Sequence, residues 1–462
     1  MREFELTIDE LKNGLSPEKL PINSQFLYEC LGFRSGKVRL EAHILLTNPL
    51  PGTVDMFYNW PFPQFITGEK YNFLIVRDTV TNQWDSVYLI SADHLTVTHI
   101  FDVDELTFGK GTLMEVADFG EYAFMTNGVI MIYWDVALNA WHPVIVSAYI
   151  PMMRTICNFK GQAIGGNVVS SWYDCDSSSY IWSKVGAMDF TPEDDNESGY
   201  RRDPFGGVVY HVRRLGDFVV GYSSKGITFI FPVSDPVPTF GFKESSNIGI
   251  INQGAVNGDF NRQVFVGEDY ILREVTKEGV KELGYQEYIQ QLSDEDIIVS
   301  YDPQKKDFYI GNSEKTFLLS PYGLTEVLQH PSAVWRSNKQ SYMLPDAVDS
   351  DSPLICTEPF DFGYRGQKTV FAIETDAQVM LEPEAAVDYS NPVNWIPTGF
   401  KPVNDQGCAA LIASGDSFRF RLRFGTIYDS TVISYIKIRY KMTDMRGMRG
   451  VYAPPTSFRG QK

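Results

Sequence analysis

Residues 300–311, SYDPQKKDFYIG, contain the pattern that decides the fold. Asp302 follows a short run of strand-forming residues, and the aromatic residue Phe308 begins a second run six positions later. The same spacing joins three earlier pairs: Asp78 and Trp84, Asp135 and Trp141, and Asp174 and Tyr180. An aspartate can accept a hydrogen bond from the backbone two residues on and so start a turn, after which the aromatic packs on the returning strand. The spacing therefore predicts the same β-hairpin in successive sheets.

Glycines at predicted turns form a second series. They are Gly165, Gly221, Gly267 and Gly311, separated by 56, 46 and 44 residues. Around residues 121–146 the two marks combine in the order strand, glycine turn, strand, aspartate turn, strand. A meander of three or four strands that repeats every ~40–55 residues is the sequence sign of a β-propeller. We therefore predict a β-propeller of about six blades.

The predicted fold is all-β and has four parts. Residues 1–66 form an N-terminal arm and the first strands, residues 67–345 the β-propeller, residues 350–445 a C-terminal β-sandwich, and residues 446–462 a tail. The polar stretch DAVDSDSP before the sandwich suits a linker, and the alternating strands after it suit a sandwich. The tail is rich in glycine, proline and arginine, so we expect a basic, flexible segment that a partner orders.

The composition limits the possible functions. Of the 462 residues, 44% are hydrophobic and 14% aromatic, which is typical of a globular protein, and the net charge is −18. No apolar run reaches the roughly 18 residues of a membrane helix, so we expect no membrane span. The acidity opposes tight DNA binding but allows double-stranded DNA to slide past without sequence-specific binding. Five cysteines without a CxxC pair indicate reduced thiols and a cytoplasmic setting for folding.

No catalytic motif stands out in the sequence. It contains no nucleophile elbow, Walker loop, HExxH or GxGxxG, and the six histidines are scattered. Ser300 and Asp302 match the start of the repeated sialidase box, but Gln304 stands where that box has glycine. We therefore expect no enzyme, no cofactor and no metal site. A carbohydrate-binding or carbohydrate-cleaving propeller is the alternative, since abundant acids could supply a carboxylate pair.

The C-terminal end is basic. From residue 417 to 462 there are ten basic and two acidic residues, a net charge of +8, which leaves −26 for the first 416 residues. SFRFRLRF and YIKIRYKM alternate apolar and basic residues, so each predicts a strand with one basic face. The short connection suggests antiparallel neighbours that place six basic residues on one face: Arg419, Arg421, Arg423, Lys437, Arg439 and Lys441.

Such a face has three possible roles. It is a solvated outer face, a docking surface for an acidic neighbour, or a nucleic-acid surface. The third role fits the sequence less well, because the aromatic residues face inward and offer bases no stacking platform. For assembly contacts we add the tail arginines Arg446, Arg449 and Arg459 to the six basic residues. As acids facing a channel we name Asp194, Asp195 and Glu197 of the loop TPEDDNESGYRRDP.

The order of several longer motifs carries a resemblance across most of the chain. They are FLYECLGFRSGKVRLEAH, GYRRDPFGGVVYHVRRLGDFVVGYSSKGITFIFP, GDFNRQVFVGEDYILREV, DIIVSYDPQKKDFYIGNSEKTFLLSPYGLTEV, FDFGYRGQKTVFAIE and RYKMTDMRGMRG. In style and order the chain resembles the tail hub and nozzle proteins of short-tailed bacteriophages, including those once called packaged-DNA stabilisation proteins.

That resemblance implies a non-enzymatic ring subunit built around a propeller. It implies a homohexamer below the portal and its adaptor ring, which continues the DNA channel, retains packaged DNA and carries tail fibres or a needle. The protein would assemble in the host bacterial cytoplasm and reside in the virion tail. The family offers no catalytic residue to carry over. An acidic subunit around the channel would repel phosphate and let DNA slide.

Overall fold

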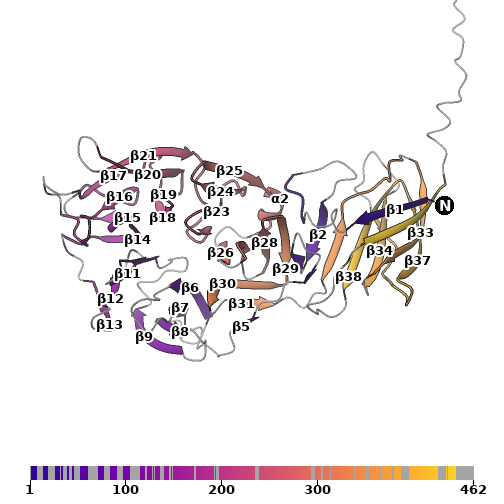
Figure 1. Ribbon diagram of the computed structural model, residues 1–462, viewed down its shortest axis with the longest axis horizontal. Coiled ribbons are helices and arrows are strands. Elements are labelled where there is room, and N and C mark those ends of the chain that lie inside the picture. Colours follow the sequence, from indigo (N-terminus) through magenta and orange to yellow (C-terminus); the bar gives the residue numbers. More distant parts are fainter. Residues whose placement is uncertain are drawn as a thin grey trace, which may run out of the picture. The chain divides into compact units, whose positions relative to one another are not determined.

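The structure is a computed structural model, and almost all of its regular elements are strands (Figure 1). It describes residues 2–7, 14–18, 26–31, 33–34, 39–40, 44–45, 53–60, 71–77, 84–90, 97–104, 115–119, 122–126, 128, 131–135, 140–144, 147, 149–170, 173–191, 193, 197–234, 239–292, 297–302, 305–312, 314–337, 340–348, 353–364, 366–376, 379–386, 395–424, 433 and 435–443. It also contains a short helix, α2 (Gln286–Ile289). In this described part, no helix has the length and apolarity to cross a membrane.

The chain forms two compact units from interleaved segments. The unit that we call the sandwich unit consists of Met1–Ala42, Phe317–Leu328 and Asp349–Lys462. The propeller-like unit consists of His43–Thr316 and Gln329–Val348. The first residues of the chain thus belong with the C-terminal sandwich and do not form an arm of their own.

Five four-stranded antiparallel meanders make up most of the described propeller-like unit. They consist of β6 (Thr53–Trp60), β7 (Tyr71–Arg77), β8 (Trp84–Ile90) and β9 (Val97–Asp104); β10 (Glu115–Asp118), β11 (Tyr122–Thr126), β12 (Met131–Asp135) and β13 (Ala140–Pro143); β14 (Met152–Phe159), β15 (Gln162–Val169), β16 (Ser179–Trp182) and β17 (Gly199–Arg202); β18 (Val209–Leu215), β19 (Phe218–Ser223), β20 (Ile227–Val233) and β21 (Thr239–Ser246); and β22 (Val256–Gly258), β23 (Gln263–Val266), β24 (Leu272–Thr276) and β25 (Gly279–Gly284).

Two smaller elements complete the described part of this unit. They are the hairpin β26 (Ile298–Asp302) and β27 (Asp307–Gly311), and the sheet β30 (Gln329–Ser337), β31 (Gln340–Val348) and β5 (Ile44–Leu45). The first strands contact one another in series: β10 with β14, β14 with β18, β22 with β26, and β26 with β30. The strand β30 also contacts β6, the first strand of the first meander. First strands packed together around a common centre are typical of a propeller, so the all-β, propeller-like prediction is confirmed.

The aspartate pattern predicts real hairpins but not their place in the sheets. The Asp302 carboxylate accepts a hydrogen bond from the Lys305 amide (3.2 Å), and the Asp302 carbonyl accepts one from the Lys306 amide (2.8 Å). This turn joins the first and second strands, β26 and β27, whereas Asp135 ends the third strand, β12, and Asp174 lies between the second and third strands, β15 and β16. The prediction of one recurring hairpin is therefore wrong. Asp78 lies outside the described residues.

The glycine period has a different cause from the predicted turns. Gly165 and Gly221 lie inside β15 and β19, the second strands of their sheets. A Cβ atom at Gly221 would lie 2.3 Å from the hydroxyl oxygen of Tyr180, a residue of the preceding sheet. Gly267 and Gly311 follow or end second strands as well. The spacing thus marks second strands, and at Gly221 the requirement is close packing between sheets.

A buried aspartate connects two neighbouring sheets. Asp203, 4% exposed, directly follows β17 and accepts hydrogen bonds from the Tyr180 hydroxyl (3.2 Å), the Ser223 hydroxyl (3.1 Å), the Thr228 hydroxyl (3.1 Å) and the Gly207 amide (3.2 Å). Tyr180 belongs to the sheet β14–β17, whereas Ser223 and Thr228 belong to the sheet β18–β21. The hydrogen bonds of this carboxylate therefore link the two sheets. Its loss would leave several buried donors without a partner.

We predict that Asp203→Ala lowers the free energy of unfolding by about 3–5 kcal/mol, since several buried donors lose their partner together. Chemical denaturation of the full chain measures this loss. The control is Asp217→Ala, which removes an exposed carboxylate that pairs with Lys160 (3.3 Å) and should cost under about 0.5 kcal/mol. Equal losses in the two variants would contradict the role of Asp203.

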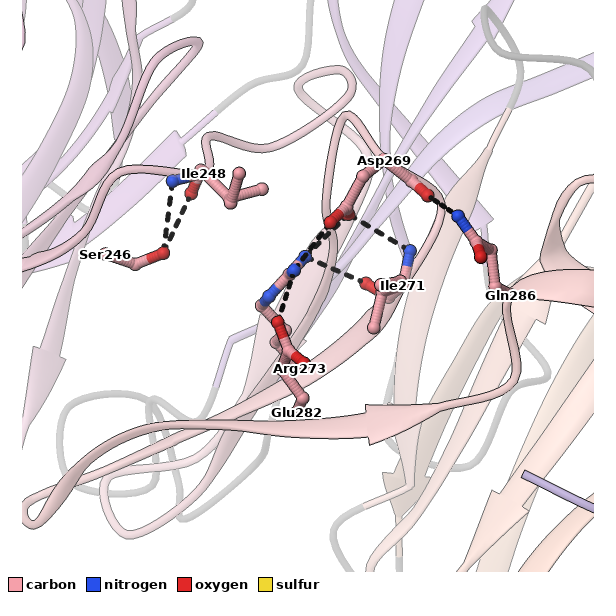
Figure 2. Close-up of polar contacts among 7 residues, drawn as sticks. All are labelled: Ser246, Ile248, Asp269, Ile271, Arg273, Glu282 and Gln286. Carbon is pink, nitrogen blue, oxygen red and sulfur yellow. Dashed lines mark hydrogen bonds and ion pairs between the residues drawn. The ribbon is translucent and has the colours of Figure 1, made fainter. Parts of the chain in front are cut away.

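Within the sheet β22–β25 a buried arginine fixes a turn (Figure 2). Arg273, 3% exposed, donates two parallel hydrogen bonds to the Asp269 carboxylate (2.6 Å each) and a third to Glu282 (2.8 Å). The Asp269 carbonyl accepts a bond from the Gln286 side chain of α2 (2.9 Å). Burial raises the pKa of Asp269, but hydrogen bonds from Arg273 and the Ile271 amide lower it more, so the net pKa lies below 3.8.

We predict that Asp269→Asn costs about 1–3 kcal/mol of unfolding free energy at neutral pH, because Arg273 loses a charged partner. A carboxyl group whose pKa is lower in the folded than in the unfolded protein stabilises the fold at pH values above its unfolded pKa. That stabilisation disappears as the pH falls through its folded pKa. The difference between wild type and variant should therefore shrink below about pH 3.8. Denaturation curves across pH measure it; Glu282→Gln, at a largely exposed position, is the control with a smaller effect. A pH-independent difference would refute the ion pair's contribution.

Two sheets form the sandwich unit. The β39 sheet has the order β1 (Arg2–Thr7), β39 (Tyr435–Met442), β33 (Lys368–Thr375) and β37 (Cys408–Gly415). The β38 sheet has the order β29 (Gly323–Val327), β2 (Leu27–Leu31), β32 (Leu354–Thr357), β38 (Ser417–Phe424) and β34 (Val379–Ala386), with β35 (Ile396–Pro397) and β36 (Lys401–Pro402) paired to β34. The remaining strands are β28 (Thr316–Ser320), β3 (Phe33–Arg34) and β4 (Arg39–Leu40).

The predicted inward faces of β38 and β39 are confirmed. Phe418 and Phe420 of β38 are fully buried, as is Ile438 of β39. The ring of Phe362 lies 5.6 Å from that of Phe418 and 4.6 Å from that of Tyr440, so it joins the two sheets across the core. Apolar alternation on each strand thus builds a shared interior.

Candidate assembly interface

The two basic strands are not neighbours. β38 lies between β32 and β34, whereas β39 lies between β1 and β33 in the other sheet. The prediction that six basic residues share one face is therefore wrong. The physical reason is that both strands turn an apolar face to the same core, so the chain crosses from one sheet to the other between them, as strands of sandwiches commonly do. The two basic rows lie on opposite outer faces.

On the β39 sheet the basic row is matched by acids of the adjacent strands. Lys437 pairs with Glu3 of β1 (3.5 Å), and Arg439 pairs with Glu3 (3.4 Å) and Glu374 of β33 (2.6 Å). Lys441 is exposed and lies opposite Thr369. Most of this charge is compensated inside the unit, which fits the interpretation of a solvated outer face.

On the β38 sheet the arginines meet acids and aromatic rings. Arg421 pairs with Glu29 (3.3 Å) and Glu382 (3.6 Å). The guanidinium carbon of Arg419 lies 3.8 Å from the ring centre of Tyr28 and 4.3 Å from that of Trp395. The same atom of Arg423 lies 4.1 Å from the ring centre of Phe400. These stacks use the attraction of a cation for a π face.

The other predicted contact residues are less informative. The tail arginines Arg446, Arg449 and Arg459 and the loop acids Asp194 and Asp195 lie outside the described residues. Glu197 is half-buried and precedes β17. Because β17 is the fourth strand of its sheet, at the opposite end from β14, Glu197 lies away from the first strands. Its place in the channel of a ring stays a prediction.

The first strands carry a buried polar cluster that sequence reasoning missed. Glu115 of β10 and His211 of β18 form an ion pair through His211 Nδ1, and His211 Nε2 contacts the Gln253 carbonyl oxygen. Arg154 of β14 donates to the Gln253 side-chain oxygen (2.7 and 3.2 Å). The cluster thus brings together side chains of three first strands, β10, β14 and β18.

The charges of this cluster compensate one another. Burial raises the pKa of Glu115, but the cations of His211, Arg213 and Arg154 lower it more, and the net shift is downward. Glu115 is 6% and His211 1% exposed. A carboxylate that is buried and already paired cannot serve as the acid or base of a glycosidase, which needs contact with substrate. The cluster therefore joins the first strands of three sheets. No local sequence pattern marks it, because Glu115 and His211 lie 96 positions apart in the chain.

We predict that Glu115→Gln lowers the free energy of unfolding by about 3–5 kcal/mol, because it removes the charged partner of His211 in a buried ion pair. Denaturation of the full chain measures the loss, with Glu268→Gln at an exposed site as the control. The double variant Glu115→Gln with His211→Gln should lose less unfolding free energy than the two single variants summed, because each single variant already breaks the same ion pair. Strictly additive losses would show that the two side chains do not interact.

Lys368 of the sandwich unit is buried and has a perturbed pKa. Its ammonium donates to the carbonyl oxygens of Gly366 (2.7 Å), Asp416 (2.8 Å) and Tyr364. Burial lowers its pKa to about 8, against the opposing effect of Asp361 and Asp416. Such a shift is common at reactive sites, but this ammonium is surrounded by backbone acceptors that it satisfies. Lys368 is therefore a structural link between the β33 start and two loops. In the described part of the chain, no group of three or more metal-ligating side chains gathers.

Comparisons with known proteins do not assign a family. No family model matches the sequence, and no curated protein matches it either. One similar solved structure is PorZ, an essential bacterial surface component of the type-IX secretion system of Porphyromonas gingivalis, at 9% identity and a TM-score of 0.36. That match covers 80% of this chain and 52% of PorZ, so the chain spans about half the length of the protein it matches.

Another similar structure belongs to the mitotic checkpoint complex. It shares 12% identity with this chain at a TM-score of 0.36, and the match covers 64% of this chain and 89% of the other.

Proposed function

We propose that the chain is a structural ring subunit of a bacteriophage tail, a hub or nozzle that continues the portal channel and forms the exit path for DNA. The observation that carries this proposal is the division of charge between the two units. The propeller-like unit contains 21 lysines and arginines and 37 aspartates and glutamates, a net charge of −16, whereas the sandwich unit, with 19 and 21, carries −2. An acidic body around a channel repels phosphate, so DNA passes without binding.

The order of motifs along the chain supports the remaining parts of the proposal. The subunit assembles as a homohexamer in the host cytoplasm, docks below a portal or adaptor ring, helps to retain packaged DNA and holds tail fibres or a needle. Its role is structural and not enzymatic. The prominent polar clusters of the described residues favour this role: Asp203, Glu115 with His211, and Arg273 with Asp269 all connect parts of the fold.

A carbohydrate-binding or carbohydrate-cleaving propeller is the competing function. In propellers a ligand is expected where the first strands converge, and here that region holds the buried Glu115–His211 pair. No exposed pair of carboxylates there favours sugar chemistry among the described residues.

We predict that the purified full chain forms a closed ring of six or twelve copies, because a hub must surround the channel. Native mass spectrometry and negative-stain electron microscopy measure this directly. Incubation with host surface glycans is the control, and we expect neither binding nor cleavage. A stable monomer that binds or cleaves glycans would overturn the proposed function and support its competitor.

A further inference from the structure

We propose that the outer face of the β38 sheet docks on the acidic propeller-like unit of a second copy of this chain. This inference rests on the proposed ring and adds the surface that closes it. Six residues define the face, which we call the outer patch: Tyr28, Met380, Trp395, Phe400, Arg419 and Arg423.

The outer patch lies on one side of one sheet. Met380 is paired directly opposite Arg423 across β34 and β38, so the two side chains point the same way. Arg419 and Arg423 alternate with the buried Phe418, Phe420 and Leu422, which fill the core on the other side. Tyr28, Trp395 and Phe400 join the face through the cation–π stacks already described.

Large apolar groups in the patch remain in contact with water. Tyr28 is 42% and Met380 41% exposed, and Arg423 beside them is exposed as well. Tyrosine, tryptophan, methionine and arginine are the residues that interface centres favour. Arg419 is held between two rings, so little side-chain entropy is lost when a partner covers it. The patch has the composition and the preorganisation of a contact surface.

Charge identifies the occupant. Arg421 on β38 has Glu29 and Glu382, and Arg439 on the other sheet has Glu3 and Glu374. Arg419 lies opposite Glu384 in the ladder, whereas Arg423 lies opposite the apolar Met380. Two guanidinium groups on an aromatic surface fit a partner with carboxylates at its surface. The propeller-like unit, at −16, supplies them in every copy. Because the two surfaces differ, the contact is head-to-tail and can close into a ring.

Charge reversal at the outer patch tests the inference. In the full chain, Arg419→Glu with Arg423→Glu should reduce the ring fraction in native mass spectrometry at least tenfold, with an unchanged circular dichroism spectrum. The matched control is Lys441→Glu, an exposed cation on the opposite face of the sandwich, which should assemble as wild type does. Raised salt should weaken the wild-type ring, since the contact is partly electrostatic.

A second measurement locates the partner surface. Lys401 is exposed and follows Phe400 in the chain, so an amine cross-linker should join it to lysines of the propeller-like unit. Rings formed from mixed ¹⁴N and ¹⁵N copies should give mixed-isotope cross-links, which arise only between copies. Cross-links confined to single copies, in a protein that does form rings, would overturn the proposed docking.

The outcomes separate this inference from the function on which it rests. A wild-type ring that survives the double reversal, or that breaks with Lys441→Glu instead, refutes the outer patch and leaves the hub function standing. A wild-type monomer refutes both. Binding of a single-stranded oligonucleotide that the double reversal abolishes would assign the patch to nucleic acid and overturn the docking on a second copy.

Discussion

The pairing of the first strand with the last is the constraint on which the sandwich unit depends. β1 runs antiparallel to β39 over six residues, from Arg2 opposite Tyr440 to Thr7 opposite Tyr435. Without β1, the strand β39 would expose one edge of its ladder, and Lys437 and Arg439 would lose Glu3. The propeller-like unit repeats the device on a smaller scale, where β5 pairs with β31 in parallel. Each unit is therefore closed by strands from the two ends of its sequence.

Closure of this kind has a kinetic consequence and a structural one. Pairing residues at opposite ends of a chain requires a large loss of loop entropy before it yields contacts, so folding is slow relative to a chain of local hairpins. Once formed, neither unit can fray from a terminus without breaking a sheet. Buried polar groups then fix how the sheets meet: Asp203 links the neighbouring third and fourth meanders, and the Glu115–His211 pair links the second and the fourth. In the proposed hub, this resistance to local opening would suit a scaffold through which DNA passes.

Local physics allowed much of the fold to be predicted from the sequence. The strands of SFRFRLRF and YIKIRYKM, their buried faces and the hairpin at Asp302 all follow from alternation and turn chemistry within about ten residues. Pairing between distant strands has no such local signal. Thus β38 and β39 look like a hairpin, and nothing in residues 2–7 indicates that they complete a sheet with residues 435–442. The glycine period pointed to the right repeat, but the close approach of Tyr180 to Gly221 appears only when two sheets are packed together.

Three arginines alternate along β38, and the side chains around each of them, not the local sequence, determine which can belong to the candidate interface. Arg421 lies between Glu29 and Glu382, while Arg419 and Arg423 meet rings. In a ring of subunits that each carry −16 on one unit, repulsion acts across every interface, yet screening limits it to roughly 8 Å at physiological salt. Short-range contacts must therefore offset it. Arginines stacked on aromatic rings supply both apolar area and positive charge at that range. Solvated lysine ammonium groups supply the charge without the apolar area. In the proposed hub, the acidity would let DNA pass and the arginine–aromatic face would hold neighbouring subunits together, so the two are parts of one electrostatic arrangement.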